Sequence, residues 1–233
     1  MRRLFLFLAV ALVLAGARRA DGAVGCTLSN PARDLKFLYP SMTTYREEAR
    51  QFDTMPGGRG MFEALKERIG SDLDPVYETL DTPYTLYTVY KGEEAIGIVH
   101  GVNVPGKGGV IQVFLSMDPK SAEIRQLVFQ RLESPAARAL KDEAFRKQFE
   151  SLTLADFYKH DYYKAADPQS DKDKVGRIAS PVKGGEGSED FAASVRGVRK
   201  NLILLDLFCY NRRHEPFFER AKEALAKLKG EKK

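Results

Sequence analysis

The sequence has few of the residues that build common metal and catalytic sites. Its 233 residues include two cysteines and three histidines. Two cysteines cannot form a Cys-only metal site, and the histidines lack the i, i+4 spacing of a zinc-binding helix. The sequence has no Gly-x-Ser-x-Gly elbow and no cysteine–histidine arrangement typical of a nucleophile. We therefore predict no metal site and no catalytic residue, and whether the protein is an enzyme stays open.

The chain also lacks a run of lysine and arginine interleaved with aromatic residues. Its formal net charge is +5, and the basic residues are spread along the chain. This distribution argues against nucleic-acid binding. The hydrophobic content of 43% and the charged content of 30% are ordinary for a globular protein, and the length suits one sizeable domain.

Only one long apolar run is visible, Leu4 to Ala15. At about a dozen residues it is too short to span a bilayer comfortably. The basic residues Arg2 and Arg3 precede it, and a small-x-small sequence ending at Ala17 follows. This pattern is typical of a secretory signal peptide at residues 1–17. We therefore expect an exported protein, periplasmic or otherwise extracytoplasmic.

The cysteines leave two questions open. Cys26 and Cys209 could form a disulfide in an oxidising compartment. Alternatively, Cys209 is a buried thiol in an apolar helix and Cys26 is exposed. The sequence Val24-Gly25-Cys26 also partly resembles a lipoprotein attachment site. Membrane association through Cys26, or through an uncleaved N-terminus, is therefore the alternative to simple export.

Strand-like segments fill the middle of the chain. They are rich in β-branched and aromatic residues and are separated by short turns. The expected strands are 76–80, 84–90, 95–104, 110–117 and 123–132, with a last short one at 175–182. Gly97 and Gly101 indicate a bulge or a close backbone approach. Strands at hairpin spacing predict an antiparallel sheet.

Helical patterns flank these strands. They cover residues 60–69, 136–149, 188–205 and 215–228, with Ser188 as the N-cap of the longest helix. Residues 41–60 are expected mostly as loop, with a turn of helix as an option at 45–52. The sequence therefore predicts an α+β fold, a single domain with an antiparallel sheet of four to six strands packed against helices. We place a linker at 18–33, the domain at 34–210, and a C-terminal amphipathic helix with a basic tail at 211–233.

Three polar segments are candidates for ligand binding. The turn Gly106–Gly109 could let a ligand approach the backbone, although a hairpin turn with a solvated Lys107 is the simpler explanation. Glu133 and Ser134 lie where a strand ends and a helix begins. The segment Lys183–Ser188 precedes a long helix, whose N–H groups can bind an anion. Here too a cap and a loop are the simpler explanation, because neighbouring acidic residues disfavour a phosphate.

In their order and spacing, these segments resemble the FMN-binding domain family. That family includes the flavin-carrying subunits of sodium-pumping NADH:quinone reductase and of the Rnf-type electron-transport complex. The resemblance covers roughly residues 84 to 205. Four segments carry it: Leu38-Tyr39-Pro40, Gly106-Lys107-Gly108-Gly109, Glu133-Ser134-Pro135-Ala136 and Phe145-Arg146-Lys147-Gln148-Phe149. The first of these, near the start of the chain, is the weaker match.

The resemblance implies a flavoprotein that serves electron transport, with FMN as cofactor. It implies a partnership with a membrane electron-transfer complex or another redox partner. The flavin ring would lie near Glu133 and Ser134, and the phosphate near the segment from Gly184 to Ser188. The cofactor-binding residues that it implies are Glu133, Ser134, Gly108, Gly109, Gly184, Gly185 and Ser188.

One departure from the family pattern changes this expectation. The family carries its flavin on a threonine before the last helix, and Gly185 stands at that position here. Shifting the alignment offers Ser180 or Ser188, but neither lies in a matching motif. We therefore expect FMN to be bound without a covalent bond. The alternative is a flavin-free extracytoplasmic module, derived from the FMN-binding domain, that binds or interacts with other molecules.

Overall fold

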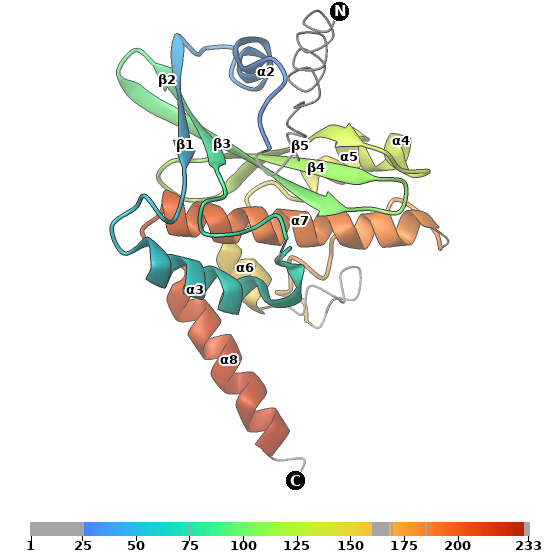
Figure 1. Ribbon diagram of the computed structural model, residues 1–233. Helices are drawn as coiled ribbons and strands as arrows, with labels where there is room; N and C mark the ends of the chain where they lie inside the picture. The colour runs from blue at the N-terminus through green and yellow to red at the C-terminus, as the bar shows by residue number, and fades with distance from the viewer. Residues whose placement is uncertain (1–25, 75, 160–167, 169, 185, 231–233) are drawn as a thin grey trace, which may run out of the picture.

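The chain folds around one five-stranded sheet, shown by a computed structural model (Figure 1). The structure describes residues 26–74, 76–159, 168, 170–184 and 186–230; the expected signal peptide and Gly185 lie outside them. The strands are β1 (Thr44–Arg50), β2 (Tyr84–Lys91), β3 (Glu94–Pro105), β4 (Val110–Met117) and β5 (Ile124–Leu132). They follow one another in sequence order, and every neighbouring pair is antiparallel. The predicted α+β fold with an antiparallel sheet is confirmed.

Helices lie on both faces of this sheet. The helical segments are α2 (Pro31–Leu38), α3 (Gly58–Ile69), the short 3-10 turn η1 (Gly70–Asp72), α4 (Ala137–Leu140), α5 (Glu143–Lys147), α6 (Leu154–Lys159), α7 (Glu186–Phe208) and α8 (Glu215–Gly230). In Figure 1, α2 lies above the sheet and α7 runs beneath it, while α3 and α6 lie below α7 and α8 projects from the body. The sheet is therefore a central layer between a small upper and a larger lower layer.

Helix α7 is the main support of the sheet. Its buried side chains Val195, Val198 and Leu202 belong to the same hydrophobic core as the strand residues Val102 and Val113. A Cβ at Gly197 would lie 2.9 Å from Cγ2 of Val113, so glycine lets the helix approach the strands closely. This close packing fixes where the N-terminal end of α7 meets the sheet.

A second, smaller hydrophobic cluster lies under α2. Leu35, Leu38 and Tyr39 pack there with Tyr87 and Phe114 of the sheet. A side chain at Gly97 would collide with the ring of Tyr39, and one at Gly101 with the ring of Phe114. The close approach predicted for these two glycines is confirmed.

Several predicted elements were wrong. The segment at 45–52 is mostly strand β1, an edge strand whose charged side chains hide the apolar alternation expected of a strand. The segments 76–80 and 175–182 form no strand, although Val175 and Ile178 are buried in the core. The expected helix 136–149 is divided into α4 and α5 by Asp142, whose side chain accepts from the N–H of Ala144 at 2.8 Å and begins a new helix.

Neither interpretation of the cysteines is fully correct. Both thiols are free, and Cys26 is buried rather than exposed. Cys26 belongs to the cluster under α2, whereas Cys209 packs against the core around α7, so the two cannot pair. Burial raises the pKa of each thiol to about 12. Both are therefore neutral packing groups at physiological pH.

Candidate functional site

Two of the segments that carry the family resemblance, Gly106–Gly109 and Glu133–Ala136, meet at one corner of the sheet. The turn between β3 and β4, the turn after β5 and the first turn of α7 all contribute to it. The β3–β4 turn closes with a hydrogen bond of 2.8 Å from the N–H of Gly106 to the carbonyl of Gly109. A side chain at Gly108 would collide with the carbonyl of Glu133, and one at Gly109 with its carboxylate. The two glycines therefore allow the turns to touch.

Asp190 of α7 joins these turns. Asp190 is completely buried, and its Oδ1 accepts a hydrogen bond of 2.7 Å from the N–H of Lys107. Its Oδ2 accepts from the hydroxyl of Ser134. The Ser134 oxygen in turn accepts from the N–H of Ala136 at 3.0 Å. One internal carboxylate thus occupies the N–H of Lys107 and the hydroxyl of Ser134, a residue expected to lie near the flavin ring.

The charges around this corner are already paired. Arg131 donates to Glu133 from Nε at 2.9 Å and from Nη2 at 2.6 Å. The ammonium of Lys107 lies 3.7 Å from the carboxylate of Glu189. Three carboxylates and two cations therefore gather at the corner. An added phosphate dianion would meet a net negative field there.

The predicted glycine-rich segment before α7 is only partly at the corner. Gly184 is exposed with φ +71°, and open space surrounds the position of its missing Cβ. Helix α7 begins at Glu186, so Ser188 lies in its first turn and is not the N-cap; this prediction was wrong. A Cβ at Gly187 would lie 3.0 Å from Cβ of Ala136, so the start of the helix packs on the Glu-Ser-Pro-Ala turn. Whether any of these residues binds a cofactor stays a prediction.

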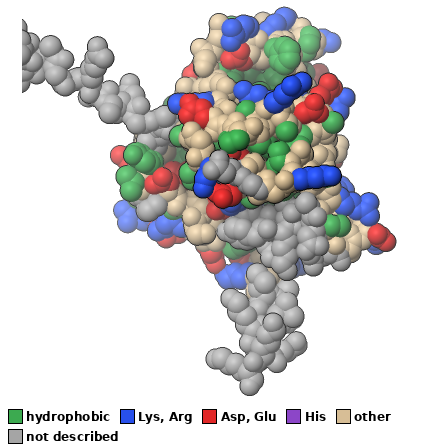
Figure 2. All heavy atoms as spheres, turned by 90° about the vertical axis from the view of Figure 1, so that its right-hand side faces the viewer, with side chains coloured by type: hydrophobic (Ala, Val, Ile, Leu, Met, Phe, Trp, Pro, Cys, Tyr) green, Lys and Arg blue, Asp and Glu red, His purple; other side chains and the backbone are tan. Residues whose placement is uncertain are grey.

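A pocket of about 600 Å³ opens beside this corner. It lies between the Pro135–Ala136 turn, helices α4 and α5, and residues 179–182. Small apolar side chains such as Ala136, Ala139 and Val182 line most of it. Figure 2 shows the side of the molecule on which α4 and α5 lie, where hydrophobic side chains and charges of both signs are interspersed. The volume lies in the range of small-molecule sites, but the hollow is broad and open to solvent.

Gln148 fixes one wall of this pocket. Its side-chain amide donates to the carbonyl of Ala179 at 3.3 Å, and its Oε1 accepts from the N–H of Ala179 at 2.7 Å. This pair holds residues 179–182 against the end of α5. Phe145 lies at the pocket and packs edge-on against Phe149 and Phe191. The aromatic segment of the family resemblance therefore builds the pocket wall, a role that the sequence analysis did not assign to it.

The pocket carries two charged side chains among its described lining residues, Arg138 and Asp142. The carboxylate of Asp142 is engaged at the start of α5. Arg138 is exposed and forms no ion pair with any residue that the structure describes. Arg138 was not predicted as a pocket residue, because nothing in the sequence distinguishes it from other exposed arginines.

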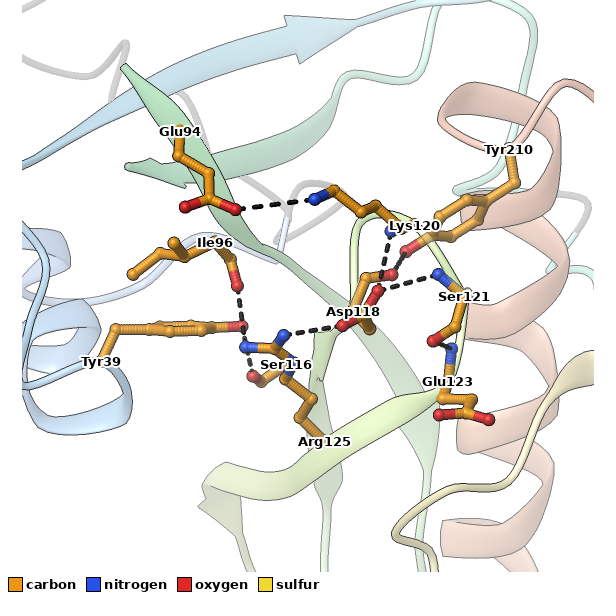
Figure 3. Close-up of polar contacts among 10 residues, drawn as sticks. All are labelled: Tyr39, Glu94, Ile96, Ser116, Asp118, Lys120, Ser121, Glu123, Arg125 and Tyr210. Atoms are coloured by element: carbon orange, nitrogen blue, oxygen red, sulfur yellow. Dashed lines mark hydrogen bonds and ion pairs between the residues drawn. The ribbon is translucent and has the colours of Figure 1, made fainter. Parts of the chain in front are cut away.

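A second polar cluster lies at the other end of β4 (Figure 3). The carboxylate of Asp118 accepts from the N–H groups of Lys120 and Ser121, both at 2.8 Å. It also accepts from Arg125 at 2.6 Å. The hydrogen bond from Ser121, together with those from Arg125 and Lys120, holds the pKa of Asp118 well below its usual range. Every partner of the carboxylate belongs to the turn or to strand β5, so this carboxylate stabilises the β4–β5 turn, while Tyr210 donates to the carbonyl of Asp118 at 2.9 Å.

Helix α7 also carries buried polar groups away from the pocket. Asp206 accepts from Arg68 at 2.6 Å and from Nδ1 of His214 at 2.9 Å. The Asp206–His214 pair was not predicted, because it forms only when the chain turns back after α7. His100 is fully buried, with its Nδ1 2.7 Å from Oδ1 of Asn201. Burial lowers the pKa of His100 to about 4, so it is neutral at physiological pH.

These polar groups do not assemble a metal centre. Within the described part of the chain, no group of three or more histidine, cysteine, aspartate or glutamate residues could hold a metal ion. Among the described helices, none combines the length and the apolar character needed to cross a membrane.

Sequence comparisons find no related protein, whereas comparison with solved structures finds similar chains. No family model matches the sequence, and no curated protein matches it. Among solved structures, the chain is similar to NqrC from Shewanella oneidensis, with 13% sequence identity and a TM-score of 0.42. The similarity covers 84% of this chain and 90% of that chain. At this level it transfers no function, and the site must be argued from the geometry of this chain.

Proposed function

We propose that this chain is an FMN-binding protein that serves electron transfer and holds its flavin without a covalent bond. One observation carries the proposal: two segments of the family resemblance, Gly106–Gly109 and Glu133–Ala136, are joined by Asp190 at one corner, directly beside a pocket of about 600 Å³. Pro135 and Ala136 belong both to that corner and to the pocket wall. The resemblance and the cavity thus point to the same place.

The residues that line the pocket suit a flavin ring, whereas none of them lies in a motif that would attach a flavin covalently. The alanines, Pro135 and Val182 offer an apolar lining for a flat aromatic ring, while Gln148 at the edge is already bonded to the backbone of Ala179. The hydroxyl of Ser180 already donates to the carbonyl of Val182 at 2.8 Å. Bound FMN would supply the electron-carrying chemistry, and the protein would bind, orient and partly shield it.

The expected location and partners belong to this proposal on sequence grounds. The basic start, the apolar run and the small residues near Ala17 support export. An exported flavin carrier would act beside a membrane electron-transfer complex or with a soluble redox partner.

The test is the colour of the purified protein. It is produced in cells supplied with FMN and a flavin-attaching transferase, and its visible spectrum is recorded before and after denaturation. We expect a yellow protein that releases its FMN on denaturation. Colour retained by the denatured chain would contradict non-covalent binding. A colourless protein that also fails to bind added FMN would remove the proposed function.

A variant that fills the pocket tests whether the flavin binds there. Ala139 lines the pocket from α4, away from the corner around Asp190. Replacing it with tryptophan, Ala139→Trp, fills the pocket while leaving the corner intact. We expect this variant to lose FMN and to keep its fold, as judged by circular dichroism. Unchanged FMN binding would place the flavin elsewhere.

A second candidate function is a flavin-free interaction module, and Asp190 favours it. The buried carboxylate already satisfies the N–H of Lys107 and the hydroxyl of Ser134, so the corner is complete without a ligand. The same spectrum decides between the two candidates, because this one predicts a colourless protein with no affinity for FMN.

A further inference from the structure

The pocket and the corner differ in how they could receive an anion, which matters if the proposed flavin site is correct. At the corner, Asp190 accepts the N–H of Lys107 at 2.7 Å and is joined by the carboxylates of Glu133 and Glu189. Both nearby cations, Arg131 and Lys107, already face a carboxylate. The corner is therefore filled by an internal anion and repels an external one.

The pocket presents the opposite situation. Arg138 is the one cationic side chain among its described lining residues, and it forms no ion pair within the described part of the chain. The pocket's one carboxylate, Asp142, accepts from the N–H of Ala144 at 2.8 Å. A guanidinium has five donors in a planar fork that matches phosphate oxygens. A free arginine at an apolar cavity suits a ligand with a flat apolar body and one anionic group.

We propose that Arg138 binds the phosphate of the flavin at the rim of the pocket, so that phosphate recognition lies at α4 and not at the glycine-rich segment before α7. This inference rests on the proposed function. It assigns a specificity-determining residue outside every segment that the family resemblance had marked, and it replaces the expected phosphate position near Gly184 to Ser188. Asp190 supports the shift, because its buried carboxylate, with those of Glu133 and Glu189 nearby, disfavours an anion at the corner.

The experiment compares two ligands that share one ring. Riboflavin lacks the phosphate of FMN, so the ratio of their dissociation constants isolates phosphate recognition. Both are titrated into the purified, flavin-free protein, and binding is followed by quenching of flavin fluorescence. We expect FMN to bind about tenfold more tightly than riboflavin, the scale of one charge-assisted interaction. The ratio should fall at high salt, since the arginine is exposed.

Variants then locate the phosphate. Arg138→Gln should bring the ratio close to one and leave riboflavin binding unchanged, while Arg138→Lys should keep part of the preference. Lys183→Gln is the matched control, since it removes an exposed cation from the glycine-rich segment. It should leave the ratio unchanged. Arg138 is exposed, so these variants are expected to fold normally.

The possible failures are distinguishable. If wild-type protein binds both flavins equally, or if Lys183→Gln and not Arg138→Gln removes the preference, the role of Arg138 is wrong while the FMN-binding function stands. If the wild-type protein binds neither flavin, the proposed function itself fails, and the role of Arg138 fails with it.

Discussion

Two aspartates hold the two ends of strand β4 in different ways. Asp118 follows the strand and accepts from N–H groups two and three residues further along the chain. Asp190 holds the turn before the strand, but it comes from α7 and reaches donors 83 and 56 residues away. The side chain of Asp118 is 25% exposed, whereas Asp190 is completely buried. One aspartate completes a local turn, and the other exists as an acceptor only after the helix has packed on the sheet.

The difference bears directly on the candidate site. Because Asp190 fixes the turn that contains Ser134, it also fixes the position of Pro135 and Ala136 in the pocket wall. Asp118 lies at the far end of β4 and has no contact with the pocket. A change at Asp190 should therefore disturb both stability and the pocket, and a change at Asp118 only the stability.

The largest effect is expected for Asp190→Ala. The variant leaves the N–H of Lys107 and the hydroxyl of Ser134 without their buried acceptor, at a cost of roughly 1–3 kcal/mol for each group. The expected loss in the free energy of unfolding is about 4 kcal/mol, measured by urea denaturation. The neighbouring exposed Glu189→Ala is the control and should lose less than about 0.5 kcal/mol. Equal stability of the two variants would contradict the structural role of Asp190.

The next effect is a dependence of stability on pH that arises from a buried histidine and not from an aspartate. His100 has a pKa of about 4 in the folded protein, below the ordinary value of 6.5 that it regains on unfolding. Between these values the unfolded chain binds more protons, so stability should fall as the pH is lowered from about 6.5 to 4. The loss is at most roughly 3 kcal/mol. In urea denaturation, the free energy of unfolding of His100→Gln should change less between pH 6.5 and 4 than that of the wild type. An equal change in both proteins would show that His100 is not the group responsible.

The sequence could predict local features of this molecule better than distant ones. The strand 110–117 was predicted with its observed bounds, because its apolar residues and flanking turns are local signals. Strand β1 was missed, since its pairing with β2 is not visible in a charged segment such as Arg46–Glu48. At the candidate site, the turns Gly106–Gly109 and Glu133–Pro135 could be recognised from their local sequence motifs. The acceptor role of Asp190 and the position of Arg138 depend on packing between distant segments and could not be predicted.

A smaller loss is expected for Asp118→Ala. Its bonds to Lys120 and Ser121 resemble a helix cap, for which the loss is typically about 1 kcal/mol. The low pKa of Asp118 means that this contribution is present above its ordinary value of 3.8 and is lost as the pH falls further. In urea denaturation, the stabilities of wild type and variant should therefore begin to converge as the pH falls below 3.8, and meet only at pH values well below that. Convergence already at pH 6 would show that another group is responsible.

The smallest effect is expected for Glu133→Gln, which tests whether every carboxylate at the corner behaves like Asp190. Glu133 and Arg131 are about half exposed, with side-chain exposures of 48% and 55%. Such a pair contributes less than about 0.5 kcal/mol, because water and salt screen it. A double-mutant cycle with Arg131→Gln measures this coupling directly. Coupling above about 1 kcal/mol would place Glu133 with Asp190 among the groups that hold the corner together. If stability is unchanged but the affinity for FMN falls tenfold, Glu133 acts on the ligand, as the family resemblance implied.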